Sequence, residues 1–458
     1  MFTWRNPNIV SFDQCVADFN AGRDTPRDFL ERCLALIARR DRTVKAFVTL
    51  NKAAARKAAD VATARYKAGK PLSMVDGCPV AIKDIIATAD MPTQMNSPVF
   101  KGWQSGQDAA CVAALRKGGA IIIGKTVTTE FAIGYSGPTT NPFDVTRTPG
   151  GSSSGTAAAV GAGMVPAGLG TQTQASTLRP ASYCGAVGYK SSVGQFHLGG
   201  VHPLSATCDH LGVIGATLGD VWRVASQLSL GIGSPGWRFL QGAGGAVPAA
   251  QKPRKLIRLY TRGWAEIDSD TKSQFEMSID ALAASGVAIA SRYTDPCIAA
   301  LEDHLDANMD DALDIVACEL RWPYEDYIVR YGKLIGERLH GLVQRAHELT
   351  PAAYERLLDT RSALRRVWRE TLAMTQADAY LTLAASGPAI TGLEYTGSRT
   401  FLICASWLGV PAFSLPLLQS QGLPLGVQLI GTSEADGKLA GVAHWFMQAQ
   451  GAEQATRT

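Results

Sequence analysis

The sequence predicts an α/β fold in which a largely parallel, buried sheet carries helices on its faces. Between residues 77 and 215, short apolar runs alternate with glycine-rich turns and helical stretches, and these runs are Pro79–Ile82, Ala120–Ile123 and Ala186–Tyr189. A helical stretch at Cys111–Gly118 leads directly into the second run. Such alternation is typical of parallel strands that are covered by helices on both sides.

The first part of the chain, residues 11–70, is expected to be helical. Pro26 follows Thr25, which is the pattern of a helix cap followed by a proline in the first turn. An apolar stripe at helical spacing follows, made of Leu30, Cys33, Leu34, Leu36 and Ile37. A second helical pattern covers Ala46–Tyr66 and ends near Gly69, because glycine can close a helix.

The predicted secondary structure changes several times along the second half of the chain. Residues 231–253 are rich in Gly, Pro and Ala and are expected to form a loop. Residues 297–375 are helical with long polar faces, and residues 397–450 return to strands and helices. A strand, a helix and a strand are predicted between the loop and the helical part, at Leu256–Tyr260, Thr271–Ala284 and Val287–Ala290. At 458 residues, length alone favours two or three structural units.

Composition excludes several classes of function. The net charge is +4 without a block of like charges, so no nucleic-acid partner is expected. The nine cysteines are scattered without a CxxC pair, which argues against a zinc site or a disulfide framework and fits a reducing compartment. Neither a signal sequence nor an apolar stretch of about 18 residues is present, so we expect a cytoplasmic protein without a membrane partner.

Three residues could together carry nucleophilic chemistry: Ser176, Ser152 and Lys83. A serine hydroxyl needs a base within hydrogen-bond reach and donors aimed at the developing oxyanion. The run Thr173–Ser176 can offer consecutive backbone N–H groups in a tight turn. A serine, a relay serine and a lysine form one known variant of the catalytic triad. The combination predicts hydrolysis of an acyl bond, with an amide favoured.

Each of the three residues also has a structural alternative. Ser176 sits among small residues and could simply form part of a loop. Ser152 could cap the helix expected after it or line a phosphate cradle, although no complete phosphate-binding motif is present. Lys83 could extend from a strand end to solvent. Burial would instead lower its pKa and produce a neutral amine that acts as a base.

Five blocks spread over most of the chain share the pattern of one known family. They are Pro149–Val160, Gly163–Gly185, Asp76–Asp84, Gly124–Ala132 and Gly422–Gly431. With these blocks the chain resembles the amidase signature family. The resemblance implies one large α/β domain over residues 1–458, with a mixed, mostly parallel sheet of about ten or more strands sandwiched by helices. It divides the domain into a signature core at 70–216, a loop at 231–253, a variable helical region at 297–395 and a C-terminal return at 396–450.

The resemblance also implies a mechanism that needs no metal or cofactor. Ser176 is the nucleophile, and Ser152 is a bridging serine with a cis peptide before or at it. Lys83 is the general base and later the acid that protonates the leaving amine through Ser152. The oxyanion hole is expected at the backbone N–H groups of Thr173, Gln174, Ala175 and Ser176. Dimers are common in the family, and nothing in the sequence confirms a homodimer here.

Two departures from the family pattern concern the substrate. Gln174 and Ala175 stand where glycines are common, and a non-glycine residue at positive φ costs about 1–2 kcal/mol. Gln174 could narrow the pocket, contact the substrate or weaken catalysis. Arg179 could anchor an acidic group of the substrate, or it could bind backbone carbonyls near Pro180. We also expect Ser153 to contact the substrate.

The function expected from these features is that of a serine amidohydrolase. It would cleave the C–N bond of a small, linear, non-peptide amide through an acyl-enzyme and release ammonia or an amine. Cys184 and His210 are expected to be structural. One alternative is the amidase subunit of a tRNA-dependent amidotransferase, which needs partner subunits. Another alternative is a scaffold or binding protein with weak catalysis, and Gln174 is the only residue that suggests it.

Overall fold

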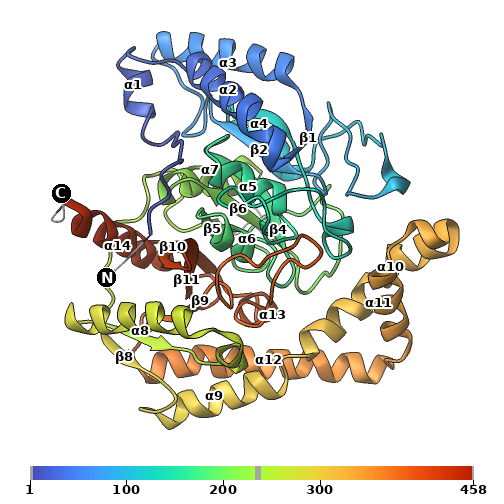
Figure 1. Cartoon of the computed structure of the whole chain (residues 1–458), viewed down its shortest axis with the longest axis vertical. Coiled ribbons are helices and arrows are strands. Elements are labelled where there is room, and N and C mark those ends of the chain that lie inside the picture. Colours follow the sequence, from blue (N-terminus) through green and yellow to red (C-terminus); the bar gives the residue numbers. More distant parts are fainter. Residues whose placement is uncertain (1–3, 233–238, 456–458) are drawn as a thin grey trace.

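The computed structural model of this chain describes residues 4–232 and 239–455. These residues form one α/β domain around an eleven-stranded sheet with the order β1-β3-β2-β4-β6-β5-β10-β11-β9-β7-β8 (Figure 1). The strands are β1 (Phe47–Leu50), β2 (Pro79–Lys83), β3 (Ile121–Thr126), β4 (Ala167–Gln172), β5 (Val187–Lys190), β6 (His210–Gly215), β7 (Lys255–Arg258), β8 (Ala288–Ala290), β9 (Ala379–Leu383), β10 (Ala412–Ser420) and β11 (Leu423–Ile430).

Strand directions in this sheet are mixed. Parallel pairs join β3, β2 and β4 on one side and β9, β7 and β8 on the other. The fold class is confirmed, but the sheet is not mostly parallel, because six of the ten neighbouring pairs are antiparallel. Sequence did not reveal the direction because strands covered on both faces look equally apolar in either orientation. One antiparallel pair, β10–β11, turns through Gln421 and Gly422, which both have positive φ as a tight hairpin requires.

Helices cover both faces of the sheet. The α-helices are α1 (Val16–Asn20), α2 (Pro26–Val44), α3 (Lys52–Lys67), α4 (Ala110–Lys117), α5 (Ser154–Gly161), α6 (Leu178–Tyr183), α7 (Leu218–Gly231), α8 (Ser269–Ala284), α9 (Pro296–Ala307), α10 (Asp311–Tyr331), α11 (Glu337–His347), α12 (Pro351–Met374), α13 (Ile403–Trp407) and α14 (Asp436–Ala455). Short 3₁₀ turns are η1 (Pro98–Phe100), η2 (Glu130–Ala132), η3 (Arg262–Glu266) and η4 (Gly332–Leu334).

The core forms two clusters of buried side chains, which lie on opposite faces of the sheet at β2 and β3, whereas the larger cluster covers both faces at β9, β10 and β11. Successive side chains of a strand point to opposite faces, so Val80 and Ile82 join one cluster whereas Ala81 joins the other. The second cluster includes α5, which is built from small residues and lies close to the sheet. A Cβ at Gly155 of α5 would lie 2.3 Å from the carbonyl oxygen of Ala46, so only glycine fits there.

The expected helix at Ala46–Tyr66 is wrong in its first turn. Residues Phe47–Leu50 form the edge strand β1 instead, which pairs antiparallel with β3. Asn51 then caps α3, since its Oδ1 accepts a hydrogen bond from the backbone N–H of Ala54. Four residues of edge strand are too few to interrupt the helical pattern of the alanine-rich sequence that follows.

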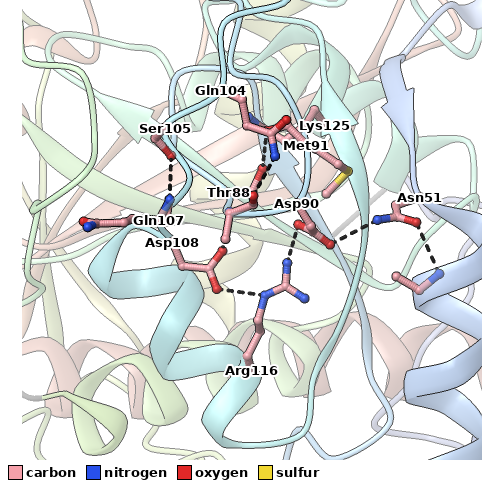
Figure 2. Close-up of polar contacts among 12 residues, drawn as sticks. Asn51, Thr88, Asp90, Met91, Gln104, Ser105, Gln107, Asp108, Arg116 and Lys125 are labelled. Carbon is pink, nitrogen blue, oxygen red and sulfur yellow. Dashed lines mark hydrogen bonds and ion pairs between the residues drawn. The ribbon is translucent and has the colours of Figure 1, made fainter.

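The long connection between β2 and α4 is held by charged groups (Figure 2). Arg116 of α4 forms ion pairs with Asp90 and Asp108, at 2.6 Å and 2.9 Å. Asp90 also accepts a hydrogen bond from Asn51 Nδ2, which ties the connection to the start of α3. A buried ion pair of 2.9 Å between Asp84 and Lys125 holds the residue directly after β2. The end of β2 is therefore fixed in place.

The predicted helical part of the chain is confirmed as α9–α12, drawn yellow to orange along the lower side of Figure 1. Helices α10 and α11 pack against each other and extend to the right of that view. Of the predicted loop at 231–253, residues 233–238 lie outside the described part. In the described ranges, no helix has the length and apolar character needed to span a membrane.

Candidate active site

A cavity of about 430 Å³ lies where the predicted catalytic segments meet the helical part of the chain. One side of it, the serine wall, consists of Ser152, Thr173, Gln174, Ala175 and Ser176. Another set of lining residues, the charged wall, consists of Arg262, Glu266, Asp310, Arg338, Glu394 and Arg399. The cavity thus joins residues that are far apart in the sequence.

Lys83 lies behind the serine wall as the last residue of β2. Its side chain is fully buried, and its Nζ lies 2.7 Å from Ser152 Oγ and 2.8 Å from Thr171 Oγ1. Burial lowers the pKa of Lys83 well below the ordinary lysine value, although the charge of Asp209 opposes the shift. A larger share of the amine is therefore neutral at neutral pH and able to accept a proton.

Ser152 directs its hydroxyl to Lys83. It follows a cis peptide bond between Gly151 and Ser152, as the family resemblance implied. The residue that precedes α5 is Ser153, and its side chain makes no capping hydrogen bond. Capping of α5 by Ser152, the structural alternative, is therefore not observed.

Ser176 lies in the turn between β4 and α6 and is partly exposed to the cavity. Its carbonyl oxygen accepts a hydrogen bond of 3.1 Å from the backbone N–H of Ser153. This bond joins the two serine segments. The structure thus brings Ser176 and Ser152 to one cavity and places Lys83 in contact with Ser152.

The turn that carries Ser176 contains backbone N–H groups without a protein acceptor among the described residues. Within the described ranges, no acceptor faces the backbone N–H groups of Gln174, Ala175 and Ser176. Gln172 Oε1 accepts hydrogen bonds from the two N–H groups that follow the turn, and Thr173 Oγ1 donates to Asp209 at 2.6 Å. Neither Gln174 nor Ala175 has a positive φ. The absence of glycine here therefore causes no backbone strain.

Arg179 uses its guanidinium to hold backbone around the cavity. Its Nη1 donates to the carbonyl oxygens of Gly397 and Ser398, and its Nη2 donates to the carbonyl oxygen of Gly151 and to Thr396 Oγ1. Burial lowers the pKa of Arg179 to about 10. Only the buried Nε lacks a partner among the described residues. Of the two roles that the sequence left open, this geometry favours the structural one.

The two other residues predicted to contact substrate lie in different surroundings. Ser153 is buried, and its hydroxyl exchanges hydrogen bonds with the backbone of Thr171 rather than lining the cavity. Gln174 lines the cavity, and in the described part of the chain its Nε2 has no hydrogen-bond partner. Because that nitrogen is itself buried, the structure does not expose it to the cavity.

Cys184 and His210 make structural contacts. The Cys184 thiol is buried and donates to the carbonyl oxygen of Pro149. The His210 ring contacts the carbonyl oxygens of Cys208 and Gln172 through Nδ1, and burial keeps its pKa well below the ordinary value. Across the two described ranges, no group of three or more His, Cys, Asp or Glu side chains is placed to hold a metal ion.

Sequence reasoning missed three residues of the site. Thr171, the second partner of Lys83, could have been found by pairing β2 with β4, because both strands end at the same edge of the sheet. The sequence around Arg338 and Arg399 does not indicate a site, because a single arginine in a helix or a loop looks like an ordinary surface residue. Their position at the cavity depends on the tertiary fold.

Comparison with known proteins agrees with this geometry. Mandelamide hydrolase of Pseudomonas putida is 29% identical over 470 residues, which cover 93% of this chain and 88% of that protein. One of the glutamyl-tRNA(Gln) amidotransferase subunits of Symbiobacterium thermophilum is 30% identical over 474 residues, covering 94% of each chain. Its counterpart in Rhodopirellula baltica is 38% identical over 219 residues, and this match spans only 44% of that relative's length.

Solved structures and a family profile extend the comparison. A crystal structure described as that of an amidase superposes with a TM-score of 0.82 and 25% identity, over 96% of this chain and 100% of the other. The profile of the family described as Amidase matches residues 28–439. The chain therefore belongs to the amidase family.

Proposed function

We propose that this protein is a serine amidohydrolase that cleaves the C–N bond of a small amide through an acyl-enzyme. The observation that carries the proposal is the 2.7 Å contact between Lys83 Nζ and Ser152 Oγ, directly behind a cavity that also exposes Ser176. A buried lysine with a lowered pKa is able to act as the base that serine requires. We assign Ser176 as nucleophile, Ser152 as relay and Lys83 as base.

The reaction would proceed in two balanced halves. Ser176 Oγ attacks the amide carbon as its proton passes to Ser152, whose own proton passes to neutral Lys83. The N–H groups of Thr173, Gln174, Ala175 and Ser176 stabilise the oxyanion. Lys83 then returns a proton through Ser152 to the leaving nitrogen, the C–N bond breaks and the amine departs. Water, deprotonated by the same relay, hydrolyses the ester and regenerates Ser176.

The size of the substrate follows from the cavity. A volume of about 430 Å³ suits a small molecule rather than a folded protein. Mandelamide hydrolase, by its name, acts on an amide. The peptide amidase of Stenotrophomonas maltophilia shares only the fold of this chain, with a TM-score of 0.77. We propose linear, non-peptide amides as substrates. A cytoplasmic location and a homodimer stay predictions. All nine cysteines are free thiols, which is consistent with the reducing compartment expected from the sequence.

A second candidate is the amidase subunit of a tRNA-dependent amidotransferase. It is favoured by the full-length similarity to the amidotransferase protein of Symbiobacterium thermophilum. Such a protein would copurify with partners from its native cell. Ammonia release by the isolated chain at rates typical of enzymes, about 1–1,000 per second, would favour the amidohydrolase instead.

The direct test is ammonia release from a panel of primary amides by the wild type and by Ser176→Ala. We expect release that depends on Ser176. The matched control is Ser285→Ala, which removes a hydroxyl at the end of α8 that does not line the cavity, and it should keep full activity. Release that persists in Ser176→Ala would refute the assignment. A folded wild type without activity on any amide would favour the partner-dependent or scaffold alternatives.

A further inference from the structure

Two arginines of the charged wall face the cavity without a protein partner. Arg338 lies in the first turn of α11, and Arg399 lies in the loop before α13. In the part of the chain that the structure describes, neither guanidinium has a hydrogen-bond or ion-pair partner. Arginine offers a planar fork of donors that matches a carboxylate. Both forks are therefore free to receive an anion.

Most other charges of the charged wall are already neutralised or hydrogen-bonded. Arg262 pairs with Asp310 at 2.7 Å. Glu266 accepts hydrogen bonds from the hydroxyls of Ser386 and Thr400. Counting all lining residues, four arginines face three carboxylates, and this leaves one net positive charge. The cavity is thus suited to a group with a single negative charge, such as a carboxylate, rather than to a doubly charged phosphate.

The electrostatics of the pair favour an anion between the two side chains. Partial burial lowers the pKa of Arg338, and burial together with the positive charge of Arg338 lowers the pKa of Arg399. Two like charges that share a partly desolvated cavity destabilise each other. A bound carboxylate would remove this repulsion and would supply the missing hydrogen-bond acceptors.

The backbone that carries both arginines is fixed. The N–H of Gly336, at the start of α11, donates to Glu130 Oε1 at 3.0 Å, which ties the helix to the cavity rim. Arg179 holds the carbonyl oxygens of residues 397 and 398, directly before Arg399. Fixed backbone positions make a site precise, because only the side chains remain to be ordered on binding.

We propose that Arg338 and Arg399 form a carboxylate-binding subsite, and that the substrate is an amide that carries a carboxylate away from the scissile bond. The proposal rests on the amidohydrolase function proposed for the same cavity. It moves the acid-binding role that the sequence suggested for Arg179 to two residues whose donors are unoccupied. It also narrows the substrate class from small amides to ω-amides of dicarboxylic acids.

The first experiment compares matched amides that differ in charge but little in shape. The ratio of kcat/KM for succinamate over succinamide, and for glutaramate over glutaramide, is measured by ammonia release. Arg338→Gln and Arg399→Gln should each lower this ratio about 10- to 100-fold, as expected for loss of a charge-assisted hydrogen bond. The control Arg330→Gln removes an exposed arginine of α10 that pairs with Asp326, and it should leave the ratio unchanged. An unchanged ratio in the two cavity variants, or an equal loss on both amides, would overturn the proposal.

A second experiment separates this proposal from the proposed reaction. Succinate and glutarate are titrated calorimetrically into Ser176→Ala, with and without Arg399→Gln. We expect binding that weakens at least 10-fold in the double variant. If dicarboxylates bind in this way but no amide is hydrolysed, the subsite stands and the amidohydrolase function fails. If amides are hydrolysed but neither dicarboxylate binds, the function stands and the subsite is refuted.

Discussion

The serine wall and the charged wall of the cavity are built in opposite ways. The serine wall comes from the segment before α5 and the turn after β4, which a backbone hydrogen bond between Ser153 and Ser176 joins, and Ser152 contacts the buried Lys83 of β2. The charged wall comes from residues 262–399, is more exposed, and leaves two arginines without protein partners in the described part of the chain. Reaction chemistry needs a fixed, desolvated relay, whereas substrate recognition needs donors that the protein itself leaves unoccupied.

This contrast predicts that the two walls respond differently to substitution. Changes in the serine wall and in Lys83 should lower the turnover of every substrate. Changes at Arg338 and Arg399 should alter the preference between substrates. Arg179 contacts both sides, since it binds Gly151 beside Ser152 and residues 397–398 beside Arg399, and it should affect stability above all.

The largest effect is expected for removal of the relay. Lys83→Met keeps the side-chain volume but removes the base, and it should lower kcat/KM at least about 1,000-fold on charged and neutral amides alike. Ser152→Ala should act similarly, and the double variant should be little worse than either single variant, because the residues act as one unit. Additive losses measured by ammonia release would show that the two residues act independently.

A pH profile tests the burial of Lys83. The active form is the neutral amine, so kcat/KM should fall as the pH drops through the pKa of Lys83. Because burial lowers that pKa well below 10.5, kcat/KM should stay at its maximum down to a pH far below 10.5. The profile is measured on a neutral amide whose own charge does not change. An acidic limb centred near the ordinary lysine value would contradict a buried base.

Arg179→Lys should separate structure from recognition. A lysine cannot reach the carbonyl oxygens on both sides of the cavity, and each buried carbonyl left without a donor costs about 1–3 kcal/mol. We expect a lower Tm by calorimetry and a lower kcat, with an unchanged ratio of succinamate to succinamide. A fall of that ratio comparable to the fall in Arg399→Gln would return the acid-binding role to Arg179.

The smallest effect is expected at Gln174. Its Nε2 has no partner among the described residues and its φ is not positive, so Gln174→Ala breaks no hydrogen bond of that group and relieves no strain. We expect a change in Tm within about 1 °C and a change in KM of less than about 10-fold. A large gain in kcat would show that Gln174 hinders catalysis, as the scaffold alternative assumed.

Much of the serine wall could be predicted because its chemistry lies in local patterns. Lys83, Ser152 and Ser176 each sit in a short segment whose residue types point to one reaction, and the structure places these segments together. Sequence also predicted the helical part of the chain and the ranges of β2, β3, β5, β7 and β8. The edge strand β1 was missed because it has only four residues and a single capping residue, Asn51, separates it from an alanine-rich helix.

The remaining features depend on contacts between distant segments. The role of Arg179 is determined by carbonyl oxygens more than 200 positions away. Arg338 and Arg399 have no partners among the described residues, and no local sequence pattern can predict that. Strand direction was equally hidden, because β4, β6 and β5 are buried on both faces and carry the same small and apolar residues in either orientation.

The relay of Lys83, Ser152 and Ser176 is tested most directly by labelling with a fluorophosphonate, followed by mass spectrometry of the intact protein and its peptides. The wild type should gain one adduct on Ser176, formed far more slowly in Lys83→Met and absent in Ser176→Ala. An adduct on another residue, or a labelling rate that does not depend on Lys83, would contradict a nucleophile at Ser176 that is activated by the buried lysine.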